Sequence, residues 1–449
     1  MSRQVRIVAV EPEFVEEELR TPLKFGTGVI THITGLTARV TVEGRDGATA
    51  TGEGYILLRD LWAFPSPALD HATRDKAMRR LAETICEAYA ALEAYAHPLT
   101  LSMTVKSELS RLAEAVTAEQ ALPEPVPLLA ALVCASPTDA ALHDAYGRLH
   151  GASTYDLYGP DFVDDDLSRY LGPRFAGRYL SDYLKPAYRP ELPAFHLVGG
   201  LDKLTQAEIT DDDPDDGLPV SLDQWIERDG LFCLKVKITG KDIEADVERT
   251  AAVAQVAYET RLRLGLDPTF FLSADSNEMH ESPEAVIEYL QRLRERSLLA
   301  WRAMLYLEQP TERDLEVHRW DMRPVAELKP VVVDEGVTDL DKLELARELG
   351  WSGIGLKTCK GHAASLLYAA LAQAEGMLLT VQDLTNPGLA LVHSAGLAAR
   401  LPTLMGVEYN ARQYLPWSQP EVQQRHESLF QVRGGKISLA SLGAEGLGY

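Results

Sequence analysis

The second half of the chain repeats one pattern, and this repeat constrains the fold more than any other feature. Short runs rich in Val, Ile, Leu and Phe end in a polar or charged residue, and a helical stretch of roughly 10–20 residues follows each run. Continuous apolar runs are typical of strands buried on both faces, and their alternation with helices requires parallel pairing through right-handed crossovers. The runs begin at Ala194, Phe232, Phe270, Ala303, Val331, Gly353, Met377 and Thr403. Eight such units in about 215 residues predict an α/β fold with a closed barrel rather than an open sheet.

The first part of the chain has a different character. Residues 1–60 alternate apolar and polar positions and are interrupted by Gly-Asp turns, which predicts strands. Residues 67–150 are rich in Ala and Leu at helical spacing, which predicts several helices. The less regular stretch 160–193 carries many Tyr, Arg and Asp residues and predicts an insertion over one face. An α+β domain is therefore expected ahead of the barrel.

Composition disfavours several classes of partner. A formal net charge of −23, from 44 Lys and Arg against 67 Asp and Glu residues, opposes binding to nucleic acid or to an anionic membrane. No apolar run reaches the roughly 18 residues that cross a bilayer, and the first residues include acids where a signal peptide needs an apolar core. The four cysteines are far apart, which disfavours disulfides and a zinc site. We therefore expect a cytoplasmic enzyme that acts on a small molecule.

Each predicted strand delivers a polar side chain near its carboxyl end, where barrel enzymes hold their catalytic groups. Lys235 and Lys237 are two residues apart on the second strand and therefore lie on the same side of it. The later strands deliver, in order, Asp275 with Asn277, Glu308, Asp334 with Glu335, Lys357, Gln382 with Asp383, and Glu408. Polar groups in register around the ring predict a single site at this end of the barrel.

The residue types at the strand ends indicate a particular chemistry. Three carboxylates from consecutive strands would repel one another strongly in a low-dielectric pocket unless a cation compensates them. All-oxygen ligation with positions open to water and substrate favours Mg²⁺, with Mn²⁺ as a substitute. Lys237 and Lys357 flank the carboxylates from opposite sides, and a lysine beside a dication has a lowered pKa that suits a general base. Such a site can hold a substrate carboxylate and stabilise the enediolate that forms when the α-proton leaves.

Five motifs resemble those of the enolase superfamily. They are LKVKITGKD at 234–242, SADSNE at 273–278, YLEQPTE at 306–312, VVVDEG at 331–336 and GLKTCKG at 355–361. Within that superfamily the chain is similar to the mandelate racemase/muconate lactonizing enzyme group, and is closest to the muconate lactonizing enzyme branch, which has a lysine on each side of the barrel. The sequence departs from this branch at Gly361-His362, where the branch usually has two glycines.

The resemblance implies a role for each residue at the strand ends. The implied metal ligands are Asp275, Glu308 and Asp334. We expect Asn277, Glu335 and Lys360 to support these ligands, although Glu335 rather than Asp334 could be the third ligand. Lys237 and Lys357 would act as acid/base groups on opposite faces of the substrate, and Lys235 would contact the substrate carboxylate. The candidates for contact with the rest of the substrate are Gln382, Asp383 and Glu408.

The resemblance also implies the domain arrangement. It gives a modified TIM barrel, of the (β/α)7β or (β/α)8 type, with an α+β capping domain. The expected boundaries are 1–192 for the cap with its insertions, 193–410 for the barrel, and 411–449 for a tail that returns to the cap. Cap loops near 23–28 and 53–55 would close over the pocket, with Phe25 and Tyr55 contacting the substrate. Assembly into a homo-oligomer is a further expectation of the resemblance.

Several reactions fit this prediction. Proton abstraction α to a carboxylate can lead to racemisation or epimerisation, to cycloisomerisation, or to dehydration by β-elimination. A Schiff-base aldolase with Lys237 or Lys357 as nucleophile is an alternative, although it gives the three carboxylates no purpose. A catalytically silent barrel that binds an anionic ligand is the third hypothesis, and the presence of both lysines and all three carboxylates disfavours it.

Overall fold

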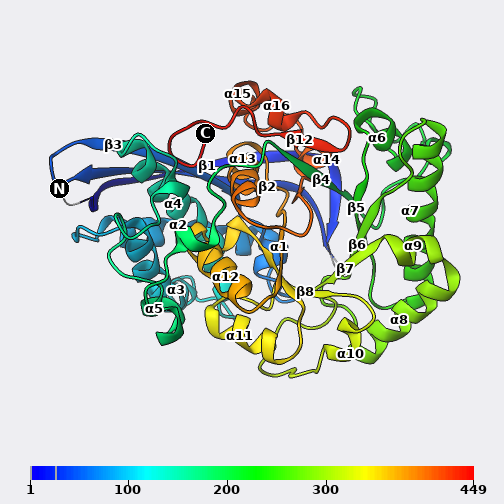
Figure 1. The fold of residues 1–449 in the computed structure, drawn as a ribbon, viewed down its shortest axis with the longest axis horizontal. Coiled ribbons are helices and arrows are strands. Elements are labelled where there is room, and N and C mark those ends of the chain that lie inside the picture. Colours follow the sequence, from blue (N-terminus) through cyan, green and yellow to red (C-terminus); the bar gives the residue numbers. More distant parts are fainter. Residues whose placement is uncertain (1–2, 26–27) are drawn as a thin grey trace.

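The computed structural model describes residues 3–25 and 28–449, with side chains described for residues 3–22 and 31–449. Its architecture is a closed parallel β-barrel beside an N-terminal capping domain, which consists of an antiparallel sheet and helices (Figure 1). The predicted fold class, an α/β barrel with an α+β cap, is confirmed.

The cap sheet is a meander of three antiparallel strands. β1 (Val5–Phe25) pairs with β2 (Gly28–Gly44), which pairs with β3 (Thr49–Leu57). The turn between β2 and β3 contains Gly47 at φ 83°, a backbone conformation that glycine adopts without strain. Asp46 stabilises the same turn, because its side chain accepts a hydrogen bond of 3.1 Å from the amide of Ala48.

Two glycines of β3 allow the strand to lie directly on the cap helix α4 (Leu128–Leu149). A Cβ atom at Gly52 would lie 2.2 Å from the amide nitrogen of Ala145, and one at Gly54 would lie 2.1 Å from the carbonyl oxygen of Pro137. Both obstacles are backbone atoms, so larger residues would force the strand and helix apart. The segment 53–55, predicted to be a loop over the pocket, is therefore the middle of a packed strand.

Helices follow the cap sheet in the part of the chain that the structure describes, and those between His71 and Leu149 confirm the helical prediction for 67–150. The helices of the cap are α1 (Asp60–Ala63), α2 (His71–Ala90), α3 (Pro98–Glu119) and α4. Asp70 caps α2 by accepting a hydrogen bond of 2.8 Å from the amide of Thr73. The short helix α1 follows β3 directly, at the point where the chain passes from the cap sheet to the mouth of the barrel.

Eight parallel strands form the barrel, one for each of the apolar runs in the sequence. They are β4 (Glu191–Val198), β5 (Cys233–Lys237), β6 (Phe271–Asp275), β7 (Met304–Glu308), β8 (Val331–Val333), β9 (Gly353–Leu356), β10 (Leu378–Val381) and β11 (Val407–Glu408). Each pairs with the next in sequence order, and β11 pairs with β4 to close the ring. β12 (Lys436–Ser438) adds an antiparallel strand to β4 outside the ring.

Helices follow the strands and cover the outside of the barrel. They are α6 (Leu222–Asp229), α7 (Ile243–Arg263), α8 (Pro283–Arg296), α9 (Leu298–Ala303), α10 (Arg323–Ala326), α11 (Leu340–Glu348), α12 (His362–Ala374), α13 (Gly388–Arg400) and α14 (Ala411–Tyr414). The helices α12 and α13 are buried almost throughout. They are buried because the cap and the segment 154–190 pack against them.

Two irregular segments connect the parts of the chain. The segment 154–190 contains the short helix α5 (Ser168–Leu171) and hydrogen bonds to the end of α13, with 2.8 Å between the amide of Lys185 and the carbonyl of Arg400. The C-terminal segment contains α15 (Pro420–Arg425) and α16 (Glu427–Phe430) and ends against the cap. There the Tyr449 hydroxyl donates a hydrogen bond of 2.8 Å to the carbonyl of Glu53.

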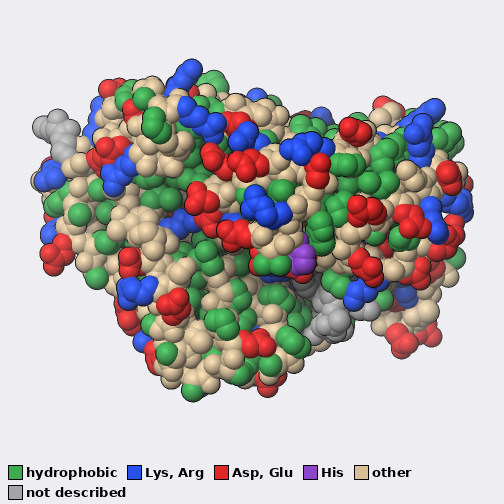
Figure 2. Space-filling view, turned by 90° about the horizontal axis from the view of Figure 1, so that it is seen from below, with side chains coloured by type: hydrophobic (Ala, Val, Ile, Leu, Met, Phe, Trp, Pro, Cys, Tyr) green, Lys and Arg blue, Asp and Glu red, His purple; other side chains and the backbone are tan. Residues whose placement is uncertain are grey.

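Acidic and basic side chains are interspersed over the face seen in Figure 2. Within the part of the chain that the structure describes, no helix has the length and apolar character needed to cross a membrane. All four cysteines are buried and unpaired with one another.

Candidate active site

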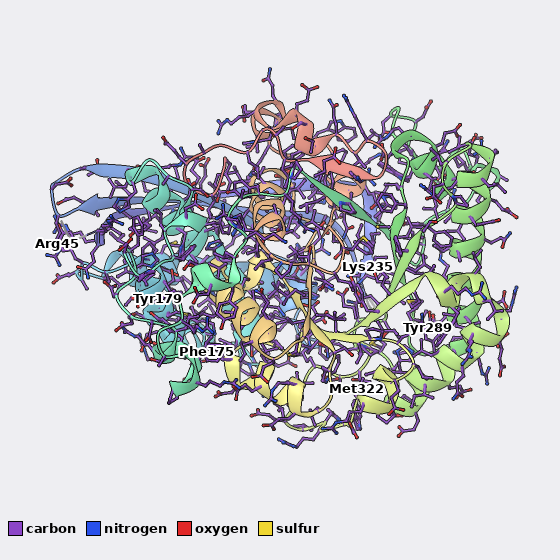
Figure 3. All side chains as sticks on the ribbon, in the orientation of Figure 1. Arg45, Phe175, Tyr179, Lys235, Tyr289 and Met322 are labelled. Carbon is purple, nitrogen blue, oxygen red and sulfur yellow. The ribbon has the colours of Figure 1, made fainter. Side chains whose placement is uncertain are left out.

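The predicted catalytic side chains gather at the carboxyl end of the barrel, and strand register explains why. Lys237 of β5 lies opposite Asp275 of β6, and Asp275 lies opposite Glu308 of β7. Three consecutive strands therefore place one charged side chain each in the same layer of the barrel. Lys235 lies two residues deeper on the same side of β5, and Figure 3 shows it within the ring of strands.

Lys235 is at the centre of one group of ion pairs. Its ammonium lies 2.7 Å from a carboxylate oxygen of Glu308, 3.0 Å from Asp275 and 3.3 Å from Glu408. The ammonium of Lys237 lies 2.5 Å from Asp275 and donates a hydrogen bond of 2.7 Å to the side-chain oxygen of Asn277. The structure thus brings both lysines of β5 to the carboxylates of three other strands.

Lys357 forms the matching group on the other side of the ring. It follows β9 directly, and its ammonium lies 2.6 Å from Asp334 and 3.9 Å from Glu308. Lys360 lies 3.1 Å from the other Asp334 oxygen and donates hydrogen bonds to two backbone carbonyls of the turn after β8. β5 and β9 are four strands apart in a ring of eight, so Lys237 and Lys357 approach the carboxylates from opposite sides.

A buried glutamine fixes the turn that carries Asp334. The side-chain oxygen of Gln309 accepts hydrogen bonds from the amides of Asp334, at 2.8 Å, and Gly336, at 3.1 Å. Its own amide group donates to the carbonyl of Thr311. Sequence reasoning gave no role to this residue, although it lies inside the YLEQPTE motif.

The ion pairs keep two of the carboxylates charged. Burial opposes ionisation of Asp275, but Lys235 and Lys237 outweigh it and hold the pKa of that carboxyl well below its usual range. Burial also opposes ionisation of Asp334, and Lys357 is the main reason that its pKa nevertheless falls to about 2. Both groups are therefore anionic at neutral pH.

Glu308 behaves differently from its two neighbours. Burial is the largest influence on it and raises its pKa well above the usual range, and the nearby charge of Asp275 raises it further despite Lys235. Of the three predicted ligands, Glu308 is thus the one whose pKa is raised, so its charged form is the least favoured. A further cation in this place would stabilise its charged form.

The donor set fits a hard divalent cation. Asp275, Glu308 and Asp334 offer only carboxylate oxygens, which Mg²⁺ prefers. Glu335 adds a fully buried oxygen, Oε2, that has no hydrogen-bonding partner. Among the residues that the structure describes, no three such side chains are arranged to hold a cation as they stand, and lysine ammoniums lie between neighbouring carboxylates. These ammoniums have to move aside for a cation to enter.

A small cavity of about 50 Å³ lies between these side chains and the cap. Its walls contain the lysines of β5 and Lys357, together with residues that follow β4, β10 and β11. Two cap residues from the start of α1, Arg59 and Trp62, also line it. The Trp62 ring lies 4.8 Å from the Lys357 ammonium, and its indole N–H donates a hydrogen bond of 2.7 Å to Glu335. Sequence reasoning missed both cap residues, because no strand-end pattern identifies them.

The substrate contacts predicted on the barrel strands, Gln382, Asp383 and Glu408, are at this end of the barrel. Both amide atoms of Gln382 are buried without a partner, and its side chain occupies the space above Gly355, where a Cβ atom would lie 2.0 Å away. Asp383 accepts a hydrogen bond of 2.6 Å from the amide of Asn410, and burial, reinforced by Glu408, raises its pKa to about 7. Asp383 and Glu408 line the cavity, as does Asn410.

Comparison with known protein families shows to which superfamily a chain with this site belongs. The family profile of enolase C-terminal domain-like proteins matches residues 219–449. The chain belongs to the enolase superfamily. Within it, the chain falls in the mandelate racemase/muconate lactonizing enzyme group, as its motifs predicted.

The relatives of this chain include several isomerases. An aromatic dipeptide epimerase from Herpetosiphon aurantiacus is 28% identical over 215 residues, which is 46% of this chain. The match spans about half the length of that relative, 54%.

Solved structures of the superfamily share the complete fold. A dipeptide epimerase from Enterococcus faecalis, in complex with Mg and L-Leu-L-Tyr, has a TM-score of 0.61 at 17% identity, covering 99% of both chains. A muconate lactonizing enzyme from Mycobacterium smegmatis, in complex with muconolactone, has a TM-score of 0.64 at 17% identity, covering 99% of this chain and 96% of that one. The L-Ala-D/L-Glu epimerase from Bacillus subtilis has a TM-score of 0.62 at 16% identity, and the match covers 99% of this chain and 98% of the epimerase.

Phe25 and Tyr55 are the two cap residues that we expect to contact the substrate. The side chain of Phe25 and residues 26–27 of the predicted loop 23–28 lie outside the described residues. Tyr55 is buried in the cap, where it packs over Gly35 and its hydroxyl donates a hydrogen bond of 2.9 Å to Glu17. Tyr55 does not line the cavity described above, and its contact with substrate stays a prediction.

The departure at Gly361-His362 has a structural reason in this member of the superfamily. His362 begins α12 and belongs to a buried cluster that joins the barrel to the cap. Its Nδ1 lies 2.8 Å from Nε2 of His393, and its Nε2 lies 2.9 Å from the hydroxyl of Tyr158. That hydroxyl also lies 2.6 Å from Nδ1 of His143. In this chain the histidine completes a hydrogen-bonded chain that a glycine at this position could not form.

Because these histidines are buried, we expect the folded protein to lose stability in weak acid. Burial lowers the pKa of His393 to about 4 and lowers the pKa of His362 well below its usual range. The unfolded chain binds these protons near pH 6.5, so the stabilisation is complete above that pH and is lost as the pH falls towards 4. We expect the difference in free energy of unfolding between pH 7.5 and pH 5.0 to be smaller by about 2 kcal/mol in His393→Gln than in the wild type.

Urea unfolding at the two pH values measures this difference. Glutamine retains a polar group near the Nε2 position but does not titrate. The matched control is His32→Gln, which removes an exposed histidine. Equal pH dependence in the wild type and His393→Gln would contradict the assignment.

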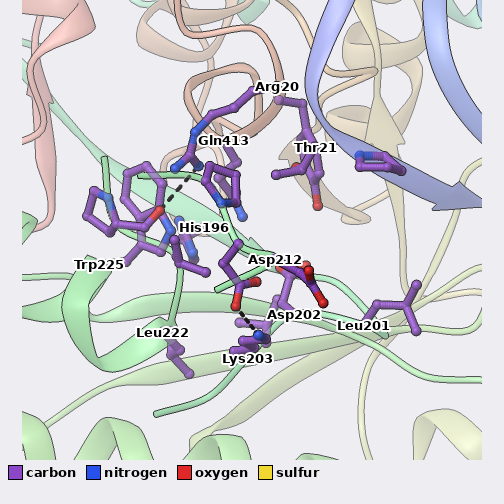
Figure 4. Close-up of a pocket in the computed structure, with 17 residues that line it drawn as sticks. Arg20, Thr21, His196, Leu201, Asp202, Lys203, Asp212, Leu222, Trp225 and Gln413 are labelled. Carbon is purple, nitrogen blue, oxygen red and sulfur yellow. Dashed lines mark hydrogen bonds and ion pairs between the residues drawn. The ribbon is translucent and has the colours of Figure 1, made fainter. Parts of the chain in front are cut away.

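A second, larger cavity of about 380 Å³ lies on the outer side of β4 (Figure 4). Leu197 faces the active-site cavity, whereas its neighbours His196 and Val198 face this one. The loop after β4 and residues 20–22 of β1 form its other walls, with Trp225 of α6. None of the predicted catalytic residues lines it, so the smaller cavity is the candidate active site.

Proposed function

We propose that this protein is a Mg²⁺-dependent enzyme that transfers a proton at the carbon α to a substrate carboxylate, giving racemisation or epimerisation. The observation that carries this proposal is the position of Lys237 and Lys357 on opposite sides of one group of carboxylates. A base on one face and an acid on the other are what inversion at a carbon centre needs. The epimerases among the relatives support the same choice.

Each side chain of the site has its own role in the proposed reaction. Asp275, Glu308 and Asp334 would hold Mg²⁺, which when bound neutralises the charge that develops on the substrate carboxylate. Lys235, which is fixed by ion pairs to three strands, contacts the same carboxylate and makes the α-proton more acidic. One of Lys237 and Lys357 removes the α-proton from its face of the substrate. The other lysine delivers a proton to the opposite face.

Dehydration shares the first step of this mechanism, and cycloisomerisation shares it in the direction that opens the ring. In both of them the second lysine steadies the enolate and does not protonate it.

The cap covers the site with Trp62 and Arg59, which limits access of water to the reacting carbon.

A panel of carboxylic acids with Mg²⁺ tests the proposal. Dipeptides, N-acylamino acids, acid sugars and muconates would be incubated with the protein and analysed by chiral chromatography and mass spectrometry. We expect inversion at Cα for at least one class, and we expect excess chelator to abolish it because the carboxylates need the cation. Turnover that persists in chelator, with the protein trapped on the substrate by borohydride, would establish the Schiff-base aldolase instead.

A further inference from the structure

Arg59 is a buried cation at the active site that forms no ion pair with any side chain the structure describes. Its side chain is 4% exposed and lines the same cavity as Lys235 and Lys357. The Nε and Nη1 atoms of its guanidinium have no hydrogen-bonding partner. Two hydrogen bonds hold its backbone. Its amide donates one of 3.0 Å to the carbonyl of Leu57, and its carbonyl accepts one of 2.9 Å from the amide of Ala63.

The nearest acids already have other partners. Asp60 pairs with Arg74 at 2.9 Å and with His71 at 3.0 Å. The carboxylate of Asp383 accepts hydrogen bonds from the backbone amides of Asn410 and Asn386. The described part of the chain shows no ion pair between Arg59 and either acid.

The lysines that line the cavity differ from Arg59 in this respect. Lys235 pairs with three carboxylates, Lys237 pairs with Asp275, and Lys357 pairs with Asp334. Burial lowers the pKa of Arg59 to about 10, and the nearby charges of Asp383 and Asp60 oppose a larger shift, so the group remains charged at neutral pH. An unpaired buried guanidinium is costly, and its planar donor groups match a carboxylate.

We propose that Arg59 binds a second, distal anionic group of the substrate, so that the substrate is an acid with two anionic groups. This inference rests on the proposed function, which places the first carboxylate at Lys235 and the metal ligands. The second carboxylate would complete the hydrogen bonds of the guanidinium. A free ammonium at the same position would bring a second cation next to Arg59, which disfavours a dipeptide with its amino terminus there.

Asn410 adds an acceptor on the same wall. Its side-chain oxygen is buried without a partner, and the residue lines the cavity with Arg59. This oxygen can accept a hydrogen bond from an N–H group that links the two ends of the substrate. An N-acylamino acid whose acyl chain ends in a carboxylate has all three features.

Three probes of equal length test the charge at the distal end. They are N-(4-carboxybutanoyl)-leucine, its terminal amide N-(4-carbamoylbutanoyl)-leucine, and N-(4-aminobutanoyl)-leucine. The measured quantity is kcat/KM for Mg²⁺-dependent exchange of the α-proton. We expect the wild type to prefer the carboxylate over the amide by about 100-fold and to disfavour the amine most.

Variants at Arg59 identify the residue responsible. Arg59→Gln should reduce the preference for the carboxylate over the amide to within about threefold, mainly by lowering kcat/KM for the carboxylate probe, whereas a merely structural role would lower kcat/KM for both probes alike. Arg59→Lys should retain part of the preference because it keeps the charge but loses the planar donor groups. Arg6→Gln, which removes an exposed cation of the cap, is the matched control and should retain the full preference.

The outcomes separate this inference from the proposed function. Exchange with equal or better use of the amide or amine by the wild type, or exchange confined to acids with one anionic group, overturns the role of Arg59 and leaves the proposed function standing. Metal-dependent exchange on no carboxylic acid overturns both. The preference of the wild type decides the matter even if Arg59→Gln fails to fold.

Discussion

Replacing Lys357 by alanine is expected to reduce inversion at Cα by about 1000-fold, and replacing Lys237 should have an effect of the same size. Each lysine approaches the carboxylates from its own side of the barrel, so neither can take the place of the other. Each variant should nevertheless exchange the α-proton of one epimer, the one whose proton faces the remaining lysine. Deuterium incorporation into each epimer, measured separately by mass spectrometry, checks this pattern.

The control for these variants is Lys436→Ala, which removes a surface lysine whose side chain is 46% exposed. It should retain full activity. Loss of exchange for the same epimer in both Lys237→Ala and Lys357→Ala would show that the lysines act on one face only. That result would contradict racemisation and favour a reaction in which one lysine steadies the enolate.

Glu308→Gln is expected to weaken Mg²⁺ binding by at least about 100-fold, with loss of activity. Glu308 is the middle one of the three predicted ligands and the only one of them whose pKa is raised, with burial as the main cause. Glutamine has nearly the same size but no charge, so the fold should be retained. Titration calorimetry with MgCl₂ measures the affinity directly.

Parallel variants assign the third ligand. Asp334→Asn should weaken Mg²⁺ binding about as much as Glu308→Gln, whereas Glu335→Gln should cost roughly tenfold, as expected for a residue that supports a ligand. Glu108→Gln, at an exposed ion pair of α3, is the matched control. Unchanged affinity in Glu308→Gln would show that the cation binds elsewhere.

The barrel was predictable because its signal is local in the sequence. Each strand is a continuous apolar run, and the strand-end residues Lys237, Asp275 and Glu308 share a layer because the register of parallel strands fixes it. The structure therefore brings together residues that the spacing alone had grouped. Their roles as acid/base groups and ligands follow from the resemblance and remain to be tested.

The residues that the cap contributes to the site could not be predicted from the sequence. Arg59 and Trp62 reach the cavity because α1 crosses the mouth of the barrel, which is a tertiary contact with no periodic signal. The motif around Tyr55 resembled a specificity loop, yet its glycines serve the close packing of β3 against α4. His362 was visible as a departure from the family pattern, but its partners come from helices far away in sequence.

Exchange of the α-proton in deuterated water tests most directly whether the protein removes a proton next to a carboxylate in a metal-dependent step. The wild-type protein would be incubated with the carboxylic acid panel and Mg²⁺, beside an identical sample with excess chelator. We expect deuterium at Cα of at least one acid with Mg²⁺ and none in the chelated sample. No exchange on any acid, with Mg²⁺ shown by calorimetry to be bound, would contradict this expectation and favour a barrel that only binds an anionic ligand.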